Sequence, residues 1–176
     1  MNVGARLEAY EALVRSWAPR IDLISPGDLD RLGRRHIEDS LKALPLVASA
    51  PVGPCVDVGS GAGFPGIPLA LAEPARHWRL LEPRAKRAAF LEEVVRSLEL
   101  DCEVLALSAA QAVADPGLAG SHALATARAL AAPARAFELL RPLCMSGGLG
   151  VVWSGKDAVV PPDAGEVVPG LASLTF

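Results

Sequence analysis

The stretch Cys55-Val56-Asp57-Val58-Gly59-Ser60-Gly61-Ala62-Gly63-Phe64-Pro65-Gly66 decides the fold expected for this chain. It begins with a short, mostly apolar run, which is typical of a buried strand, and continues into a glycine-rich turn. When such a turn joins a first strand to a first helix, a ligand can approach the backbone closely and the helix N-terminus attracts anionic groups. The segment therefore predicts a ligand-binding turn at one edge of a sheet.

Strand and helix patterns alternate after this turn. Further short strands are predicted at residues 78–81, 102–107, 123–127 and 149–153. Helices are predicted at residues 83–100 and 133–143. Strands and helices in series form a mostly parallel sheet with helices on both faces, so the fold class is α/β and Rossmann-like.

The amino-terminal 50 residues have a different pattern, because they are helical throughout. Apolar residues at alternating steps of four and three form one face of a first helix: Val3, Leu7, Tyr10, Val14 and Trp17. A second helical region follows, with a break expected near Gly33, and residues 45–54 are the candidate linker. We expect a helical region at 1–50 packed on a catalytic domain at 51–176.

Composition excludes several classes of protein. The chain has 176 residues, 51% of them apolar, a mean hydropathy of +0.32 and a net charge of −3, which is not the composition of a disordered chain. The longest uncharged stretch, residues 58–72, is shorter than the ~20 residues of a membrane span. Three scattered cysteines, Cys55, Cys102 and Cys144, favour buried thiols over disulfides or a metal site. We expect a cytoplasmic protein with no membrane, no metal and no stable protein partner.

The glycine turn fits two kinds of nucleotide-like ligand. Gly61, Gly63 and Gly66 match the spacing of a dinucleotide fingerprint, but the first of them falls two residues after the strand ends. Counted from Gly59, the pattern is G-x-G-x-G, with Phe64 where the dinucleotide motif has glycine. A third interpretation is a turn that serves only chain geometry.

Two carboxylates favour a methyl-donor site among these alternatives. Asp57 lies two residues before the first glycine, as is characteristic of S-adenosylmethionine sites. Glu82 closes the second predicted strand, where an acid is placed to accept both ribose hydroxyls. Together with the backbone of Ser60 and the other loop residues, they predict binding of S-adenosylmethionine.

The acceptor is expected to carry its own lone pair. Methylation of exocyclic amines commonly uses an Asn/Asp-Pro-Pro-aromatic loop after the fourth strand, where this chain has Thr126-Ala127-Arg128-Ala129. A ring nitrogen such as guanine N7 has no proton to lose, so alignment and proximity matter more than a general base. We therefore expect no acid or base in the catalytic set, with Arg128 and His36 positioning the acceptor.

Basic residues form two clusters that are candidates for binding phosphates. Arg84, Lys86 and Arg87 lie near the start of a predicted helix at the ligand-binding edge of the sheet. Arg31, Arg34 and Arg35 lie in the amino-terminal helices. The alternative for both clusters is a solvated, ion-paired surface.

The chain resembles a known family in four blocks of sequence. They are Arg35-His36-x-x-Asp39-Ser40, the glycine loop extended through Ile67-Pro68-Leu69-Ala70, Leu80-Leu81-Glu82-Pro83 with Lys86-Arg87 and Phe90-Leu91, and Thr126-Ala127-Arg128-Ala129. These blocks are similar to the bacterial small-subunit ribosomal RNA (guanine-N7)-methyltransferases, also called the glucose-inhibited division protein B family. The resemblance covers residues 21–156. It implies a class I methyltransferase fold and N7 methylation of one guanine in 16S rRNA or the small ribosomal subunit.

The resemblance also implies roles for individual residues. Gly59 and Phe64 would line the donor site, Glu82 followed by Pro83 would hold the ribose, and Ala110 and Gln111 would flank the adenine. Arg128 would lie between donor and acceptor. The residues expected to face RNA are basic: Arg34, Arg35, His36, Arg84, Lys86, Arg87 and Lys156.

Four departures from the family pattern concern the acceptor side and the end of the chain. The family's Arg-x-Glu appears as Ala109-Ala110-Gln111, its Asn-Leu-Thr as Asp22-Leu23-Ile24-Ser25, and its Leu-Lys-Gly as Trp153-Ser154-Gly155. The family also continues beyond the equivalent of Phe176, so we expect a shortened member or a missing last strand. Two other functions stay open: methylation of a small heteroaromatic molecule, and binding without turnover.

Overall fold

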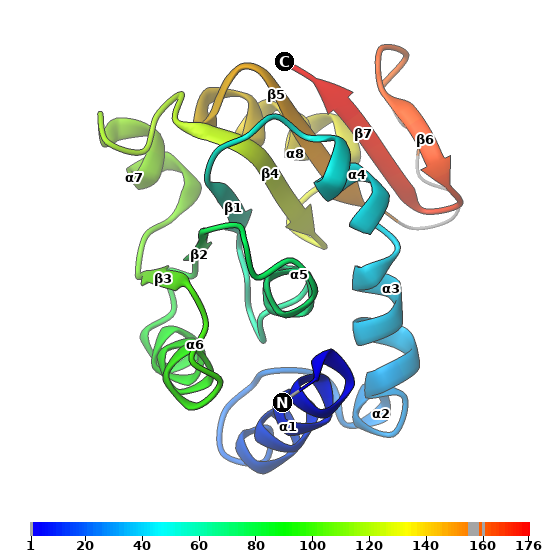
Figure 1. Ribbon diagram of the computed structural model, residues 1–176, viewed down its shortest axis with the longest axis vertical. Helices are drawn as coiled ribbons and strands as arrows, with labels where there is room; N and C mark the ends of the chain where they lie inside the picture. Colours follow the sequence, from blue (N-terminus) through cyan, green and yellow to red (C-terminus); the bar gives the residue numbers. More distant parts are fainter. Residues whose placement is uncertain (1, 155–158, 160) are drawn as a thin grey trace.

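A seven-stranded sheet forms the centre of the molecule (Figure 1). The computed structural model describes residues 2–154, 159 and 161–176. The strands are β1 (Cys55–Val58), β2 (Trp78–Leu81), β3 (Cys102–Leu105), β4 (His122–Arg128), β5 (Cys144–Trp153), β6 (Gly165–Val168) and β7 (Leu171–Thr175). They are arranged in the order β3-β2-β1-β4-β5-β7-β6. Strands β1 to β5 are parallel, which confirms the predicted α/β class.

The last two strands differ from the sequence prediction. β7 runs antiparallel to β5, with Trp153 opposite Leu171, and β6 runs antiparallel to β7. The sequence prediction did not include these two strands, which form a hairpin over residues 165–175 at this edge of the sheet. Sequence patterning missed the hairpin because both strands are short and lie at or near the edge, where alternation of apolar and polar residues is weak.

Eight α-helices and two irregular turns are present in the described part of the chain. They are α1 (Val3–Trp17), α2 (Pro26–Leu29), η1 (a π-helical turn, Gly33–Ile37), α3 (Glu38–Leu41), α4 (Leu44–Ser49), α5 (Gly66–Ala72), α6 (Ala85–Ser97), α7 (Ala109–Ala114), α8 (Pro133–Leu140) and η2 (a 3-10 turn, Arg141–Leu143). The π-helical turn lies at the predicted break near Gly33. The predicted linker is partly wrong, because α4 occupies residues 44–49. None of the helices in the described residues is long and apolar enough to cross a membrane.

The two faces of the sheet have separate cores. Val56 and Val58 of β1 belong to a cluster with α7 and α8, whereas Cys55 packs with residues of α4 and α5. This alternation follows from the pleat of the strand, which sends successive side chains to opposite faces. Helices therefore cover both faces, and the carboxyl ends of the strands stay accessible to a ligand.

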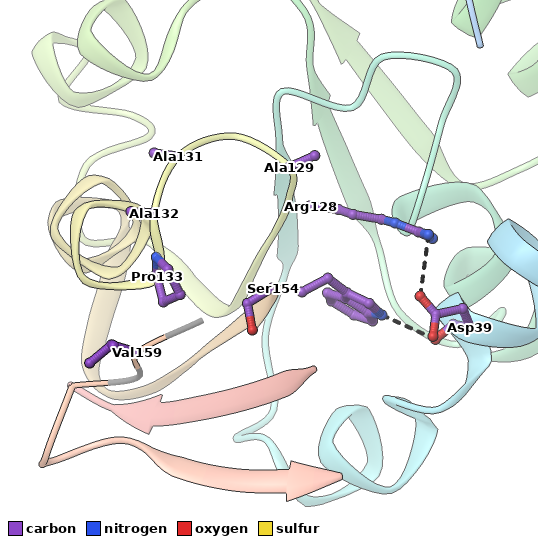
Figure 2. A pocket seen from close by; sticks show the side chains of 9 residues that line it. Asp39, Arg128, Ala129, Ala131, Ala132, Pro133, Ser154 and Val159 are labelled. Carbon is purple, nitrogen blue, oxygen red and sulfur yellow. Dashed lines mark hydrogen bonds and ion pairs between the residues drawn. The ribbon is translucent and has the colours of Figure 1, made fainter. Parts of the chain in front are cut away.

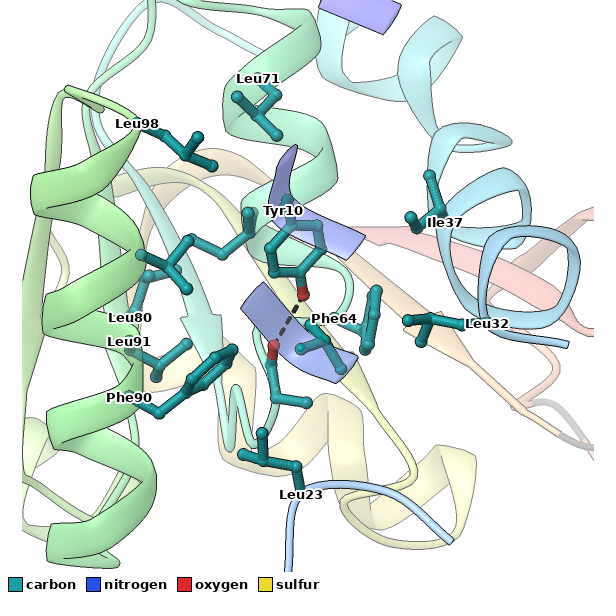
Figure 3. Close-up of a cluster of buried hydrophobic side chains, with 14 residues drawn as sticks. Tyr10, Leu23, Leu32, Ile37, Phe64, Leu71, Leu80, Phe90, Leu91 and Leu98 are labelled. Atoms are coloured by element: carbon teal, nitrogen blue, oxygen red, sulfur yellow. Dashed lines mark hydrogen bonds between the residues drawn. The ribbon is translucent and has the colours of Figure 1, made fainter. Parts of the chain in front are cut away.

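The amino-terminal helices share a core with the helices of the sheet. Figure 3 shows Tyr10 of α1 packed among Phe64 of the glycine loop and Phe90 and Leu91 of α6. Leu32 from the second helical region belongs to the same cluster. One continuous set of buried side chains therefore packs the segments that contain Tyr10 and Leu32 against the glycine loop.

Candidate functional site

A cavity of about 320 Å³ lies at the carboxyl ends of the parallel strands. Gly59 after β1, Glu82 and Pro83 after β2, Ser108 after β3 and Arg128 at the end of β4 all line it. The loops that follow parallel strands meet at one edge of the sheet, and ligands of open α/β folds bind there. The structure thus brings together residues that are 69 positions apart in the sequence, from Gly59 to Arg128.

The glycine loop can form only because glycine tolerates its backbone. Gly59 has φ +74°, and a Cβ atom there would lie 2.9 Å from Cδ1 of Leu130. Gly63 has φ +97°, and its Cβ would lie 2.6 Å from Cγ1 of Ile67 and 2.9 Å from the hydroxyl of Tyr10. Positive φ and close approach both exclude a side chain. The loop backbone therefore reaches the wall of the cavity at Gly59 and the amino-terminal helix at Gly63.

The carboxylate of Glu82 is fixed at the cavity by two backbone groups. Its Oε2 accepts a hydrogen bond from the Gly61 N–H at 2.9 Å, and its Oε1 accepts one from the Arg84 N–H at 2.9 Å. The residue is only 3% exposed. An ionised carboxylate offers about four lone-pair sites, so each oxygen can accept another hydrogen bond. Glu82 thus presents to the cavity a fixed carboxylate that can accept further hydrogen bonds.

Asp57 has a different position from the one expected. Its side chain is fully buried and is not among the residues that line the cavity. It accepts hydrogen bonds from Oγ1 of Thr126 at 2.7 Å and from the Gly66 N–H at 3.3 Å. Burial raises the pKa of Asp57 to about 6, although these hydrogen bonds oppose the shift. The structure therefore gives Asp57 a role in fixing the glycine loop to β4 rather than a direct ligand contact.

Two other residues predicted to contact the donor lie outside the cavity. Ser60 is buried, and its hydroxyl donates to the backbone oxygen of Asp57. Phe64 is 7% exposed and packs in the core between Tyr10 and His36. Neither residue lines the cavity, although Gly59, which directly precedes Ser60, does. The loop therefore lines the cavity with its backbone at Gly59 and not with the side chains of Ser60 and Phe64.

The residues predicted to flank the adenine lie beside the cavity and do not line it. Leu107, Ser108 and Ala109 line the cavity, whereas Ala110 and Gln111 are exposed and do not. Gln111 takes part in a capping box, in which its backbone N–H and side chain bond with Ser108 at the start of α7.

A second cavity, of about 520 Å³, adjoins the first. Figure 2 shows its lining of small apolar residues, Ala129 and Ala131 to Pro133, with Asp39 and Arg128 on one side. Arg128 and Ala129 line both cavities. Arg128 therefore lies at the boundary between two neighbouring cavities.

Arg128 ties the amino-terminal segment to the end of β4. Its Nη2 lies 3.3 Å from Oδ2 of Asp39 and donates to the Arg35 carbonyl at 2.8 Å, while Nη1 donates to the His36 carbonyl at 3.3 Å. Burial lowers the pKa of the guanidinium, and the charge of Asp39 opposes that shift. A planar group with several donors is suited to hold two carbonyls and a carboxylate at once.

His36 is placed behind Arg128 rather than in a cavity. Its ring stacks on Phe64 with centroids 5.0 Å apart, and its buried Nε2 has no hydrogen-bond partner among the described residues. Burial and the neighbouring Arg128 charge lower the pKa of His36, so the imidazole is neutral at pH 7. Its contact with Phe64 indicates support of the glycine loop.

The predicted RNA-facing residues fall into two groups. Arg84, Lys86 and Arg34 are exposed, with Arg84 at the N-cap of α6. Arg35 pairs with Asp28 at 3.1 Å, and Arg87 pairs with Asp22 at 3.0 Å and donates to its carbonyl. Lys156 lies outside the described residues.

Pro54-Cys55 is a Pro-Cys pair, the arrangement often used by enzymes that methylate pyrimidine carbons. Cys55 opens β1 at the amino end of the strand, away from the cavity, and burial raises its pKa to about 11. A protonated, buried thiol at this edge is not a nucleophile for the site.

Comparison with known proteins identifies relatives over most of the chain. Residues 4–160 match the family GidB, rRNA small subunit methyltransferase G. A protein named ribosomal RNA small subunit methyltransferase G from Acidiphilium cryptum is 39% identical over 154 residues, covering 86% of this chain and 68% of the relative. One of the same name from Rhodospirillum centenum is 44% identical over 156 residues, covering 87% and 68%. Against the relative from Roseiflexus castenholzii, the chain spans 59% of that protein's length.

Solved structures confirm the fold. A putative methyltransferase from Escherichia coli superposes with a TM-score of 0.59 at 19% identity, covering 88% of both chains. A geranyl diphosphate C-methyltransferase from Streptomyces coelicolor, solved with S-adenosyl-L-homocysteine, gives a TM-score of 0.52 at 16% identity, covering 66% of this chain and 44% of the other. At these identities the likeness establishes the class I methyltransferase fold alone.

Proposed function

Because the chain belongs to the rRNA small subunit methyltransferase G family, we propose that it transfers a methyl group from S-adenosylmethionine to N7 of a guanine in 16S rRNA. The observation that carries this proposal is the position of Glu82. Its carboxylate is fixed by the backbone of Gly61 and Arg84 and retains acceptor capacity toward the 320 Å³ cavity.

The donor fits the residues that line this cavity. Glu82 would accept hydrogen bonds from the two ribose hydroxyls, because an ionised carboxylate only accepts. The backbone at Gly59 leaves room for the methionyl part, and Leu107 to Ala109 would lie beside the adenine. Bound there, S-adenosylmethionine supplies an electrophilic methyl group on a positively charged sulfur.

The acceptor would occupy the 520 Å³ cavity on the other side of Arg128. Guanine N7 has a lone pair and no proton, so the residues around it need only align the base. This agrees with the position of Arg128, whose guanidinium is bonded to Asp39 and to two carbonyls. A guanidinium is a hydrogen-bond donor and not a base. Alignment of this kind can lower a barrier by roughly 7–11 kcal/mol.

The RNA would reach the site across the exposed cations. Arg84 and Lys86 lie at the start of α6, beside a groove of about 290 Å³ that also includes Ile21 and Asp22 of the amino-terminal region. The cations on the α6 side of this groove would contact phosphates, which position RNA without reading its sequence. We place this reaction in the cytoplasm, with 16S rRNA or the small subunit as the partner.

The test is transfer of labelled methyl groups to 16S rRNA, to small ribosomal subunits and to free guanine nucleotides in parallel. We expect label in the rRNA or the subunit, released as 7-methylguanine, and a loss of at least 10-fold in the Glu82→Gln variant. Label in free nucleotide alone would instead indicate a small-molecule methyltransferase. Absence of S-adenosylmethionine binding in a calorimetric titration would indicate a relative without turnover.

A further inference from the structure

The larger cavity contains an acid, Asp39, that has no role in the proposed binding of the methyl donor. Asp39 lines it beside Arg128, and no other carboxylate is present among the described lining residues. Its side chain is 28% exposed, so part of the carboxylate is accessible from the cavity. The remaining lining is mostly alanine and proline, with Trp153 and Ser154. A flat apolar ring with hydrogen-bond donors on one edge is the kind of ligand that such a cavity accommodates.

Three contacts fix the position of Asp39. Its Oδ2 lies 3.3 Å from Nη2 of Arg128, and its Oδ1 accepts from Nζ of Lys42 at 2.6 Å. Its backbone oxygen accepts from Nε1 of Trp153 at 3.1 Å. Figure 2 shows the carboxylate lying toward the Arg128 guanidinium at the side of the cavity. Because each carboxylate oxygen already has a basic partner, the carboxylate is oriented before any ligand binds. Each oxygen can still accept another hydrogen bond.

We propose that Asp39 binds the Watson–Crick edge of the acceptor guanine, accepting hydrogen bonds from N1–H and the N2 amino group. This inference rests on the proposed function. A carboxylate is acceptor-only, and guanine is the purine with two adjacent donors on that edge. Adenine presents an acceptor at N1, which a carboxylate repels. Asp39 would therefore select guanine, a task that none of the predicted site residues performs.

The same contact leaves N7 free to react. In a purine, N7 lies on the side opposite the N1 and N2 edge, so a guanine held at Asp39 by that edge keeps N7 clear of the Asp39 carboxylate. Arg128 and Ala129 line both cavities, so the guanine would lie next to the donor cavity.

Asp39 would also favour the reaction electrostatically. The N7 lone pair forms the new N–C bond, the S–C bond breaks with both electrons going to sulfur, and no proton is transferred. The positive charge thus moves from sulfur to the purine, which makes N1–H a stronger donor. A hydrogen bond from N1–H to a carboxylate strengthens as this charge develops, so it stabilises the transition state more than the bound substrate.

The test compares guanine with inosine at the methylated position. After the position has been mapped, 16S rRNA carrying inosine there is assembled by ligation; inosine keeps N7, O6 and N1–H but lacks the N2 amino group. We expect the wild-type protein to prefer guanine by about 10-fold or more in kcat/KM, the range for one well-placed base contact. In Asp39→Asn we expect kcat/KM on guanine to fall about 10- to 100-fold. The ratio of kcat/KM on guanine to that on inosine should approach one.

Two features of this design separate specificity from folding. The guanine-to-inosine ratio is unaffected by the fraction of folded enzyme, because that fraction cancels. Asp39→Glu keeps the charge but moves it by one methylene, so it should lower the ratio as well if the Asn variant does not fold. The matched control is Asp30→Asn, since Asp30 is an exposed acid of the same helical region that lines neither cavity. It should retain the wild-type ratio.

An unchanged ratio in Asp39→Asn and Asp39→Glu, with both substrates slowed equally, would show that Asp39 only holds Arg128 and would overturn the inference. That outcome leaves the proposed function intact, because the wild-type protein still methylates guanine. If the wild-type protein labels neither rRNA nor subunits, the proposed function fails and the inference fails with it.

Discussion

The hydroxyl of Tyr10 donates a 2.6 Å hydrogen bond to the carbonyl of Ala62, which joins the first helix to the middle of the glycine loop 52 residues later. Both residues are buried, and the Tyr10 ring lies 5.4 Å from that of Phe64. Burial raises the pKa of Tyr10 well above 10.0, so its hydroxyl keeps its proton and donates at every physiological pH. The amino-terminal helix is thus part of the structure that shapes the donor cavity.

Tyr10→Phe should lower the free energy of unfolding by about 1–3 kcal/mol, because it leaves the buried Ala62 carbonyl without this partner. It should also weaken S-adenosylmethionine binding, since the loop backbone loses a support. Chemical denaturation and calorimetric titration measure the two effects. Val14→Ala, which removes packing from the same helix but keeps the Tyr10–Ala62 hydrogen bond, should lower stability alone. Donor affinity equal in Tyr10→Phe and wild type would contradict the coupling.

Gly63→Ala tests how tightly the loop packs. The new Cβ would lie within 3 Å of both Ile67 and Tyr10, at φ +97°. We expect a loss of about 2–4 kcal/mol in the free energy of unfolding, from the sum of backbone strain and overpacking. Gly120→Ala is the matched control, because Gly120 has φ +64° but no atom within 4 Å of its Cβ position. It should lose only about 1 kcal/mol. Equal losses would show that backbone strain alone explains both.

Asp57 predicts a pH dependence of stability. Burial raises its pKa from 3.8 to about 6, so the folded chain binds this proton more tightly than the unfolded chain does. The contribution of Asp57 to the free energy of unfolding therefore falls as pH rises from about 4 to about 7, by up to about 3 kcal/mol. In Asp57→Asn this contribution disappears. Denaturation at several pH values should show a variant that gains stability relative to wild type as pH rises; a constant difference between the two proteins would refute the assignment.

Glu82→Gln should weaken S-adenosylmethionine binding by about 10- to 100-fold, since hydrogen bonds to a charged group contribute about 1.5–3 kcal/mol. The amide also places a donor against one of the two N–H groups that now bind the carboxylate. Isothermal titration calorimetry measures the affinity. Glu92→Gln, an exposed change on α6, serves as the control and should bind as wild type does. An affinity in Glu82→Gln within two-fold of wild type would remove Glu82 from the donor site.

Arg128→Lys should separate donor binding from methyl transfer. Lysine keeps the charge but cannot bond simultaneously to Asp39, the Arg35 carbonyl and the His36 carbonyl, as the guanidinium does. We expect kcat/KM for RNA methylation to fall about 10-fold or more while donor affinity changes less. Radiolabel transfer and calorimetry on the same preparation give both values. A larger loss in donor affinity than in transfer would place Arg128 mainly on the donor side.

The sequence determined the parts of this protein that depend on short-range pattern. The glycine loop of residues 59–66 requires positive φ at Gly59, Gly61 and Gly63, and only glycine adopts such angles freely, so the residue types reveal the turn. Apolar periodicity likewise located β1, β2 and the first helix to within a residue or two. Glu82 could be identified because a position at the end of a strand follows from the strand's own boundary.

The tertiary structure decided which side chains reach the ligand. Asp57 turns away because the pleat of β1 directs it under the loop to Thr126, and sequence spacing does not reveal which face is buried. Asp39 enters the larger cavity because Arg128 and Trp153, from strands about 90 and 114 residues later, hold it there. Contacts at that separation depend on how the helices pack on the sheet, and packing is a property of the whole chain that no local pattern contains.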